Sequence, residues 1–304
     1  MPLPHQFQGL FLPFILMTSD NLAVMAQPET KTLTTPRLSV SIVLHRGNLD
    51  HLRATLAGLS VAILAAVPDA HVYLIDQSLD QSYSEAAKAV CGEILHPRGV
   101  QWLYLEPNEN AGYGAGHNIV LTRDLGRYHL ILNPDVELPA NWLAESLFFL
   151  EANPQVVLYA SRGMNGRGEE EYLAKRYPTV GVLLLRAFGT EWLRNRFRKQ
   201  LDHYELRDLS AEPSVQDVPL LSGCCLIAKT DALQSVNGFD ERFFLYFEDY
   251  DLAMRMQGLG RVVRAGALQF VHHGGQASKK GLRHIMWFIA GGMRFFSRWG
   301  WRWI

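Results

Sequence analysis

Hydrophobic positions in the first half of the chain alternate between short β-branched runs and stretches whose apolar residues recur at helical spacing. The runs predict strands at 38–44, 71–76, 100–105 and 129–133, and the helical spacing predicts helices at 49–65, 81–94 and 116–125. Repeated strand–helix units are typical of a parallel, doubly wound sheet with helices on both faces. The pattern therefore predicts an α/β fold.

Polar segments follow three of these strands, at 76–78, 108–118 and 133–135. Ligands of such sheets bind beyond the carboxyl ends of the strands, so we expect the active cleft along this edge. The rhythm breaks at about 161–215, which we interpret as an excursion over the sheet, and it returns at Val218.

Composition narrows the class of protein. With 304 residues, 48% of them hydrophobic and 19% charged, the chain can bury a large core as one domain or two coupled ones. The formal net charge of −1 supplies no basic field, which disfavours a nucleic-acid partner. Three cysteines, two of them adjacent, suit neither a disulfide framework nor a zinc cluster and favour a reducing cytosol.

The N-terminal segment, 1–36, is interpreted as a flexible leader. Gly9 to Met17 resembles a short signal core, but no basic segment precedes it and Pro13 interrupts it. No apolar run reaches the roughly 18 to 20 residues that a membrane-spanning helix needs, so no bilayer crossing is expected.

Two polar motifs predict a site for a phosphate-bearing ligand. Asn133-Pro134-Asp135 follows a strand, where a carboxylate can hold a divalent ion beside a diphosphate, although a simple turn is the alternative. The loop 108–118 has glycines that let the backbone approach a ligand and that open a helix favouring anions. A tight strand-to-helix turn is the alternative there, and the glycine spacing fits neither the dinucleotide fingerprint nor a P-loop. The candidate residues in this loop are Asn110, Gly112, Gly114, Gly116 and Asn118.

A carboxylate pair, Glu248 and Asp249, ends a dense aromatic segment at the predicted start of a helix over 249–257. The helix dipole is expected to keep both groups ionised, and an ionised carboxylate can accept a proton from a hydroxyl. Capping of the helix is the alternative. Asp251 is interpreted as a supporting residue because it cannot share their helix face.

A histidine pair, His272 and His273, follows the strand-like stretch 268–271. One imidazole of such a pair can coordinate a metal ion. The alternative is a buried, hydrogen-bonded histidine.

Together these motifs resemble family 2 glycosyltransferases of the GT-A fold, particularly the bacterial rhamnosyltransferase-like branch. The resemblance covers about 38–278 and rests on NENAGYGAGHN (108–118), LNPDVEL (132–138), GCCLIAK (223–229), GFDERFFLYFEDYDL (238–252) and VHHGG (271–275). It implies a mostly parallel Rossmann-like sheet flanked by helices, with a nucleotide-binding half (37–138) and an acceptor-binding half (139–278). It also implies an inverting transfer that depends on Mg²⁺ or Mn²⁺.

The resemblance implies a role for each matching residue. Asp135 matches the last acid of the metal-binding Asp-x-Asp motif, and His272 or His273 completes the coordination. Asp76 matches the acid that contacts the nucleotide base or ribose, and Asn133 stands at the first acid of Asp-x-Asp. Asp249 matches the catalytic base, with Glu248 beside it. The turn after the first strand, 44–48, departs from the family pattern, which concerns the nucleotide-base contacts.

The C-terminal segment, 279–304, predicts an amphipathic helical tail. Four tryptophans alternate with arginines after Gly281, and Lys279 and Lys280 add positive charge. This composition suits a helix lying on an anionic membrane surface. Packing on the catalytic domain or on a second subunit, as a homo-oligomer, is the alternative, and the basic stretch 194–199 either joins the same surface or is solvated.

The resemblance implies a glycosyltransferase, and the composition of the tail predicts that it is peripheral to the cytoplasmic face of the plasma membrane. The expected donor is a nucleotide sugar, dTDP-L-rhamnose, and the expected acceptor is a lipid-linked or polysaccharide chain of a surface glycan such as O-antigen or capsule. The competing interpretations are a nucleotidyltransferase, which would need a lysine-rich phosphate loop, and a catalytically silent saccharide-binding or membrane-scaffold protein.

Overall fold

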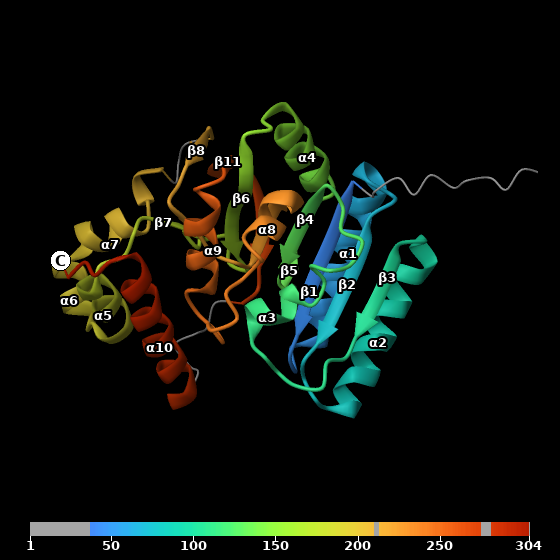
Figure 1. Cartoon of the computed structure of the whole chain (residues 1–304), viewed down its shortest axis with the longest axis horizontal. Helices are drawn as coiled ribbons and strands as arrows, with labels where there is room; N and C mark the ends of the chain where they lie inside the picture. The colour runs from blue at the N-terminus through green and yellow to red at the C-terminus, as the bar shows by residue number, and fades with distance from the viewer. Residues whose placement is uncertain (1–36, 210–212, 275–280, 304) are drawn as a thin grey trace, which may run out of the picture. The chain divides into compact units, whose positions relative to one another are not determined.

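The computed structural model describes residues 37–209, 213–274 and 281–303. They all belong to one compact unit that spans 35–304, with a large sheet between two layers of helices (Figure 1). The leader, 1–36, lies outside the described residues, as do Gly275, Lys279 and Lys280. The expected boundaries at 138 and 278 stay predictions.

The elements follow in chain order. The strands are β1 (Leu38–Leu44), β2 (His71–Asp76), β3 (Gln101–Leu105), β4 (Tyr128–Leu132), β5 (Val136–Glu137), β6 (Val156–Asn165), β7 (Ala174–Lys175), β8 (Val215–Asp217), β9 (Leu220–Leu221), β10 (Cys225–Lys229) and β11 (Arg261–His272). The helices are α1 (Leu49–Ala66), α2 (Gln81–Leu95), α3 (Tyr113–Asn118), α4 (Trp142–Ala152), α5 (Val180–Phe188), α6 (Glu191–Arg196), α7 (Arg198–Tyr204), α8 (Thr230–Ser235), α9 (Glu248–Met256) and α10 (Leu282–Trp299), with 3₁₀ turns at His96–Arg98 and Arg207–Leu209.

The main sheet has the strand order β3-β2-β1-β4-β10-β6-β11-β5, and β8 pairs with β11. Strands β1 to β4 are parallel, as the sequence predicts, so their carboxyl ends meet at one edge. Strand β10 then runs antiparallel to both β4 and β6, and β5 and β8 run antiparallel to β11. The α/β fold is confirmed, and the sheet is mixed, with its parallel part concentrated in the N-terminal half.

Side-chain alternation along the strands builds a core on each face. In β1, Leu38, Val40 and Ile42 face the core beneath α1, α2 and α4, whereas Val43 faces the opposite side. Ile131, Leu158 and Leu226 join α8 and α9 on that second side. Both faces of the sheet are therefore buried, which explains the nearly continuous hydrophobic strands.

One described helix, α1, is long and apolar enough to cross a membrane by length and composition alone. Its residues Leu52, Leu56, Leu59 and Ile63 are buried in the core against the sheet. This helix thus has the role of a core helix in the fold.

Two helix boundaries differ from the predictions. The helix predicted at 116–125 is the short α3, which begins at Tyr113 and ends at Asn118. Its start depends on a distant segment, because Tyr113 N–H donates to Phe244 O (3.0 Å). The tail helix ends at Trp299, where Gly300 adopts a positive φ of 105°.

Candidate functional site

Asp135 and His272 meet at the carboxyl edge of the sheet. Strand β5 brings them together, because His272 pairs with Val136. His272 Nε2 lies 3.4 Å from Asp135 Oδ1, and that buried oxygen accepts no hydrogen bond from any residue that the structure describes. A Cβ on Gly274 would lie only 2.5 Å from Asp135 Oδ2 and 2.7 Å from His272 Nε2, so glycine keeps this space open.

Glu171 orients the His272 ring. After β6 the chain turns and returns beside it, with Glu171 N–H donating to Gly163 O (3.0 Å). This return places Glu171 Oε2 2.6 Å from His272 Nδ1 and leaves Nε2 facing Asp135. A carboxylate on the far nitrogen of a ligating histidine fixes its tautomer and orientation.

The two adjacent histidines have different surroundings. His273 Nε2 lies 2.7 Å from Glu137 Oε1, and its ring stacks on His51 with centroids 5.0 Å apart. Because neighbours on a strand point to opposite faces, only one imidazole can face Asp135. The geometry favours His272 for that position and gives His273 a different partner.

Asp135 and His272 stabilise each other's charged forms. Burial alone would raise the pKa of Asp135, but His272 lowers it below the usual value. Burial would likewise lower the pKa of His272, but the neighbouring carboxylates of Asp135 and Glu171 raise it to about 9. The site therefore holds a cation next to Asp135 in the form of the imidazolium itself.

The donor atoms fit a divalent cation that also binds phosphate. Within the described residues, no group of three or more His, Cys, Asp or Glu side chains is placed to hold a metal ion. Mg²⁺ and Mn²⁺ need few protein ligands, because phosphate oxygens and water fill their other positions. Asp135 Oδ1, which accepts no hydrogen bond from the described residues, can serve as one ligand, and His272 Nε2 can serve as a second once the metal ion displaces its proton.

Asp249 lies in the first turn of α9, close to β10. Its Oδ2 accepts from Gly223 N–H (2.9 Å) and its Oδ1 accepts from Tyr250 N–H (2.8 Å). Burial raises the pKa of Asp249 to about 6, although these N–H groups stabilise the charged form. A carboxylate with this pKa is poised to accept a proton near neutral pH.

Glu248 differs from the prediction that the helix dipole keeps both acids ionised. Its side chain is buried, and its Oε2 has no hydrogen-bond partner among the described residues. Burial first, and then the neighbouring charge of Asp249, hold the pKa of Glu248 well above its usual value. Desolvation outweighs the dipole here, so the pair carries one negative charge, on Asp249.

Tyr113 connects the two halves of the site. Its hydroxyl lies 2.9 Å from Asn133 Oδ1 and 2.6 Å from Gly223 O, and Gly223 N–H in turn binds Asp249. After burial, the charges of both Asp249 and Asp135 contribute to the raised pKa of Tyr113. The Tyr113 hydroxyl therefore lies near both carboxylates, and the roles of the two carboxylates stay predictions.

Asp76 is placed at the expected edge but faces inward. Ser78 N–H and the Ser84 hydroxyl donate to its carboxylate at 2.8 and 2.5 Å, and the Tyr104 hydroxyl donates at 2.9 Å. Burial would raise the pKa of Asp76, but these hydrogen bonds lower it. In this arrangement the carboxylate fixes the turn after β2, and its contact with a nucleotide stays a prediction.

The glycine loop is shaped by the protein itself. Gly112 has a φ of 102°, and a Cβ there would lie 2.3 Å from Phe244 O. A Cβ on Gly114 would likewise clash with the Phe239 side chain, and a Cβ on Gly116 would clash with the Gln77 side chain. The strand-to-helix turn is thus the structural reason for these glycines, and nucleotide contacts by them stay a prediction.

The two asparagines of this loop support its conformation. Asn110 Oδ1 accepts from Gly112 N–H (3.0 Å). Asn118 binds the backbone of Phe239 in both directions, at 2.8 and 2.9 Å, and also reaches Glu241. Asn118 therefore joins α3 to the turn before α9, a different role from the predicted ligand contact.

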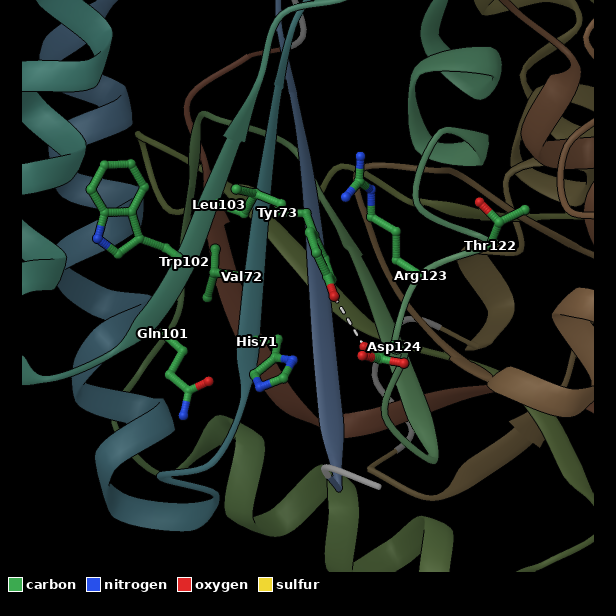
Figure 2. Close-up of a pocket in the computed structure, with 9 residues that line it drawn as sticks. All are labelled: His71, Val72, Tyr73, Gln101, Trp102, Leu103, Thr122, Arg123 and Asp124. Carbon is green, nitrogen blue, oxygen red and sulfur yellow. Dashed lines mark hydrogen bonds between the residues drawn. The ribbon is translucent and has the colours of Figure 1, made fainter. Parts of the chain in front are cut away.

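A separate hollow of about 460 Å³ lies at the amino ends of the parallel strands, opposite the carboxyl ends that carry the candidate site (Figure 2). It is lined by the first residues of β2 and β3 and by 122–124, where Tyr73 OH donates to Asp124 O (3.0 Å). Since β2 begins at His71 and ends at Asp76, this hollow lies at the amino end of the strand. It includes none of the candidate site residues.

Sequence reasoning missed two residues of the site. Tyr113 lies in the glycine loop, and a single aromatic residue among small residues is the signal that could have identified it. Glu171 belongs to the excursion at 161–215, and the only local signal is the run of three acids, 169–171, after a glycine-rich turn.

Comparison with known proteins identifies the class of enzyme. No protein-family model matches the chain. Curated relatives include the N-acetylglucosaminyl-diphospho-decaprenol L-rhamnosyltransferases of two Mycobacterium tuberculosis strains, each 28% identical over 237 residues, covering 73% of this chain and 72% of the relative. The chain is a GT-A glycosyltransferase. The resemblance to rhamnosyltransferases is confirmed.

Solved structures confirm the fold of this GT-A glycosyltransferase. The structure of GalNAc-T7 with UDP, GalNAc and Mn²⁺ matches this chain with a TM-score of 0.61 at 15% identity. The match covers 88% of this chain and 48% of GalNAc-T7, so this chain spans about half the length of GalNAc-T7. The mannosyltransferase PcManGT from Pyrobaculum calidifontis, in complex with GDP-Man and Mn²⁺, has a TM-score of 0.51 at 14% identity, covering 88% of this chain and 77% of that one.

Proposed function

We propose that this glycosyltransferase moves L-rhamnose from dTDP-L-rhamnose to a lipid-linked saccharide, with inversion, during synthesis of a surface glycan such as O-antigen or capsule. The observation that carries the reaction is the buried Asp135 Oδ1, which faces His272 Nε2 and accepts no hydrogen bond from the described residues. The Tyr113 hydroxyl contacts Asn133 and Gly223, and Gly223 N–H binds Asp249. The sugar and the acceptor class are supported by the name of the curated relatives.

Asp135 and His272 form the donor side. When bound between them, Mg²⁺ or Mn²⁺ would neutralise charge that develops on the leaving diphosphate. Glu171 keeps Nε2 of His272 directed at this position. Asn133 Oδ1 accepts a hydrogen bond from the Tyr113 hydroxyl, which also contacts Gly223 O beside the base.

Asp249 performs the acceptor chemistry. Its carboxylate takes the proton of the attacking hydroxyl while the oxygen forms the new bond to the sugar carbon and the diphosphate leaves. The two N–H groups from Gly223 and Tyr250 hold the carboxylate in one orientation. Glu248, which stays protonated, supplies no competing negative charge.

A donor screen tests this function directly. With Mn²⁺ present, dTDP-L-rhamnose is expected to raise the melting temperature, because a ligand that binds only the native state stabilises it. Without Mn²⁺ the shift should shrink, and acceptor-dependent release of dTDP should follow with inverted configuration in the NMR spectrum of the product. Stabilisation without turnover on any saccharide acceptor would instead identify a silent binding protein.

The rate should depend on pH through Asp249. Because the base must be deprotonated and its pKa is raised to about 6, kcat/KM should fall by roughly tenfold per pH unit well below that value. The contribution of this group to stability has the opposite sign, since the folded state binds more protons between pH 3.8 and about 6. Initial rates at saturating Mn²⁺ give the profile, and a flat rate down to pH 4 would contradict the assignment.

The tail also belongs to the proposal. We place the membrane contact of this enzyme on 281–304, at the cytoplasmic face of the plasma membrane, where a lipid-linked acceptor would be found. Within the described part of the tail, α10 packs on the catalytic domain through Phe295 and Phe296 and leaves a second apolar stripe exposed.

A further inference from the structure

Helix α10 has two apolar stripes, and only one of them is covered. Gly291, Gly292, Phe295 and Phe296 are buried against the domain. The second stripe is exposed and recurs at helical spacing along the helix: Leu282, Ile285, Met286, Ile289 and Met293. The exposed stripe adjoins the buried one, and an exposed apolar stripe of this length is typical of a surface that contacts a membrane or a partner.

The excursion at 180–197 extends this exposed stripe. Leu184 and Phe188 on α5 are 54% and 62% exposed, and Trp192 on α6 is 72% exposed. An almost wholly apolar hollow of about 120 Å³ lies between α5 and α10, with Leu184 on one wall and Met293 on the other. Helices α5, α6 and α10 gather at the same end of the molecule (Figure 1).

Backbone hydrogen bonds fix the two segments together. Val180 N–H donates to Arg302 O (2.8 Å) and Gly181 N–H donates to Trp303 O (3.1 Å), so the first turn of α5 is capped by the end of the tail. The Tyr177 hydroxyl donates to Gly300 O (2.6 Å). The apolar surface is therefore one unit, although its halves are about 100 residues apart.

The charge of this surface differs from that of the protein. The whole chain has 29 basic and 30 acidic residues, but 180–199 and 282–303 contain a single acid, Glu191. Their basic residues are Arg186, Arg194, Arg196, Arg198, Lys199, Arg283, Arg294, Arg298 and Arg302. Three of them pair with acids outside these segments, Arg186 with Glu205, Arg198 with Asp202, and Arg298 with Asp240 and Asp251, and basic residues still outnumber acids among the rest. Arginines beside exposed aromatic residues are typical of surfaces that rest on anionic bilayers.

We propose that α5, α6 and α10 together form one docking surface for an anionic lipid bilayer, and that the tail is only half of it. The lipid surface is favoured over a protein partner by the excess of positive charge and by the exposed side chains of Trp192, Trp301 and Trp303. Phe247, which directly precedes the Glu248–Asp249 pair, lines the apolar hollow. Docking thus brings the first turn of α9 to the membrane, and this orientation toward a lipid-linked acceptor rests on the proposed function.

Vesicle binding by the full-length protein tests the composite surface. The variants are Leu184→Glu and Trp192→Glu on the excursion and Met286→Glu on α10. Phe148→Glu, on α4 and 76% exposed in the wild type, is the matched control. Vesicles of phosphatidylcholine with phosphatidylglycerol are compared with vesicles of phosphatidylcholine alone, at low and high salt.

All three surface variants should bind the anionic vesicles about tenfold more weakly or worse, because each removes one buried apolar side chain from the membrane contact. Phe148→Glu should bind like the wild type, and salt should weaken the wild-type interaction. Trp192→Phe, which keeps an aromatic ring, should retain most of the binding and shows that loss in Trp192→Glu is not misfolding. Melting temperatures of all variants complete that control.

Three results would overturn the proposal. Normal binding by Leu184→Glu and Trp192→Glu with loss only in Met286→Glu would leave α10 as the whole contact. Equal loss in Phe148→Glu would mean that the surface is not specific. A wild-type dimer in light scattering, separated by Leu184→Glu with unchanged vesicle binding, would assign the surface to a second copy of the chain. Because these measurements use no sugar substrate, they stand even where the donor screen fails.

Discussion

Replacing Asp249 by asparagine should lower the rate of sugar transfer by about 10² to 10⁴-fold, the range that a positioned general base contributes. The amide cannot accept the hydroxyl proton, and no other described carboxylate is bound to both Gly223 and the first turn of α9. The measurement is kcat for transfer to a saccharide acceptor at saturating donor and Mn²⁺.

The fold should tolerate this change. Asparagine can keep one of the two N–H contacts, from Gly223 or Tyr250, and leaves the other buried N–H without an acceptor, at a cost of about 1 to 3 kcal/mol. The substitution also removes a buried negative charge beside Glu248, which offsets part of that cost. Nucleotide binding should therefore be almost unchanged, as measured by calorimetric titration with dTDP.

Glu248→Gln is the matched control for this variant. Because Glu248 is already held in its neutral form, the amide keeps both its charge state and its size. Transfer by Glu248→Gln should remain within about tenfold of the wild type, so the pair separates loss of the base from disturbance of the first turn of α9. Full turnover by Asp249→Asn would remove Asp249 as the base.

Most strands and helices in the N-terminal half of the fold could be predicted from the sequence, because they depend on local hydrophobic patterns. The predicted strands at 38–44 and 71–76 coincide with β1 and β2, since β-branched runs buried on both faces have few alternative structures. Parallel pairing of β1 to β4 then follows from the strand–helix alternation. The carboxyl edge could therefore be placed before any contact was known.

Long-range contacts account for what the sequence could not show. Helix α3 begins at Tyr113 because Phe244, far along the chain, accepts its N–H, and no local propensity contains that information. The protonated state of Glu248 depends on its burial and on the charge of Asp249, which outweigh the effect of the helix dipole. Glu171 reaches His272 only through the turn after β6.

The adjacent histidines show the same limit at a single strand end. Sequence spacing alone does not distinguish His272 from His273 as the ligand of a metal ion. The pairing of β11 with β5 determines which of them faces Asp135, because it turns His272 toward that residue and leaves His273 against Glu137. Register in the sheet, set by distant strands, is what selects the side chain.

Replacing Asp135 by alanine should weaken Mn²⁺-dependent binding of dTDP by more than about 100-fold, because loss of even an outer partner of a metal ligand costs about 10 to 100-fold in affinity. The variant removes a carboxylate whose Oδ1 has no other described partner and lies 3.4 Å from His272 Nε2. Calorimetric titration of dTDP with and without Mn²⁺ separates the metal-dependent part of the affinity. Binding without Mn²⁺ should change little.

Glu171→Gln and His273→Gln are comparison variants for the loss of Mn²⁺-dependent affinity expected in Asp135→Ala. Glutamine can still meet His272 Nδ1 but no longer carries the negative charge that supports the imidazole, so Mn²⁺-dependent affinity should fall by about 10 to 100-fold, less than in Asp135→Ala. His273→Gln, whose side chain contacts Glu137, should fall least of the three. If His273→Gln lost as much affinity as Asp135→Ala while Glu171→Gln bound Mn²⁺ normally, the cation would have to lie beside Glu137, and the donor side built on Asp135 and His272 would be wrong.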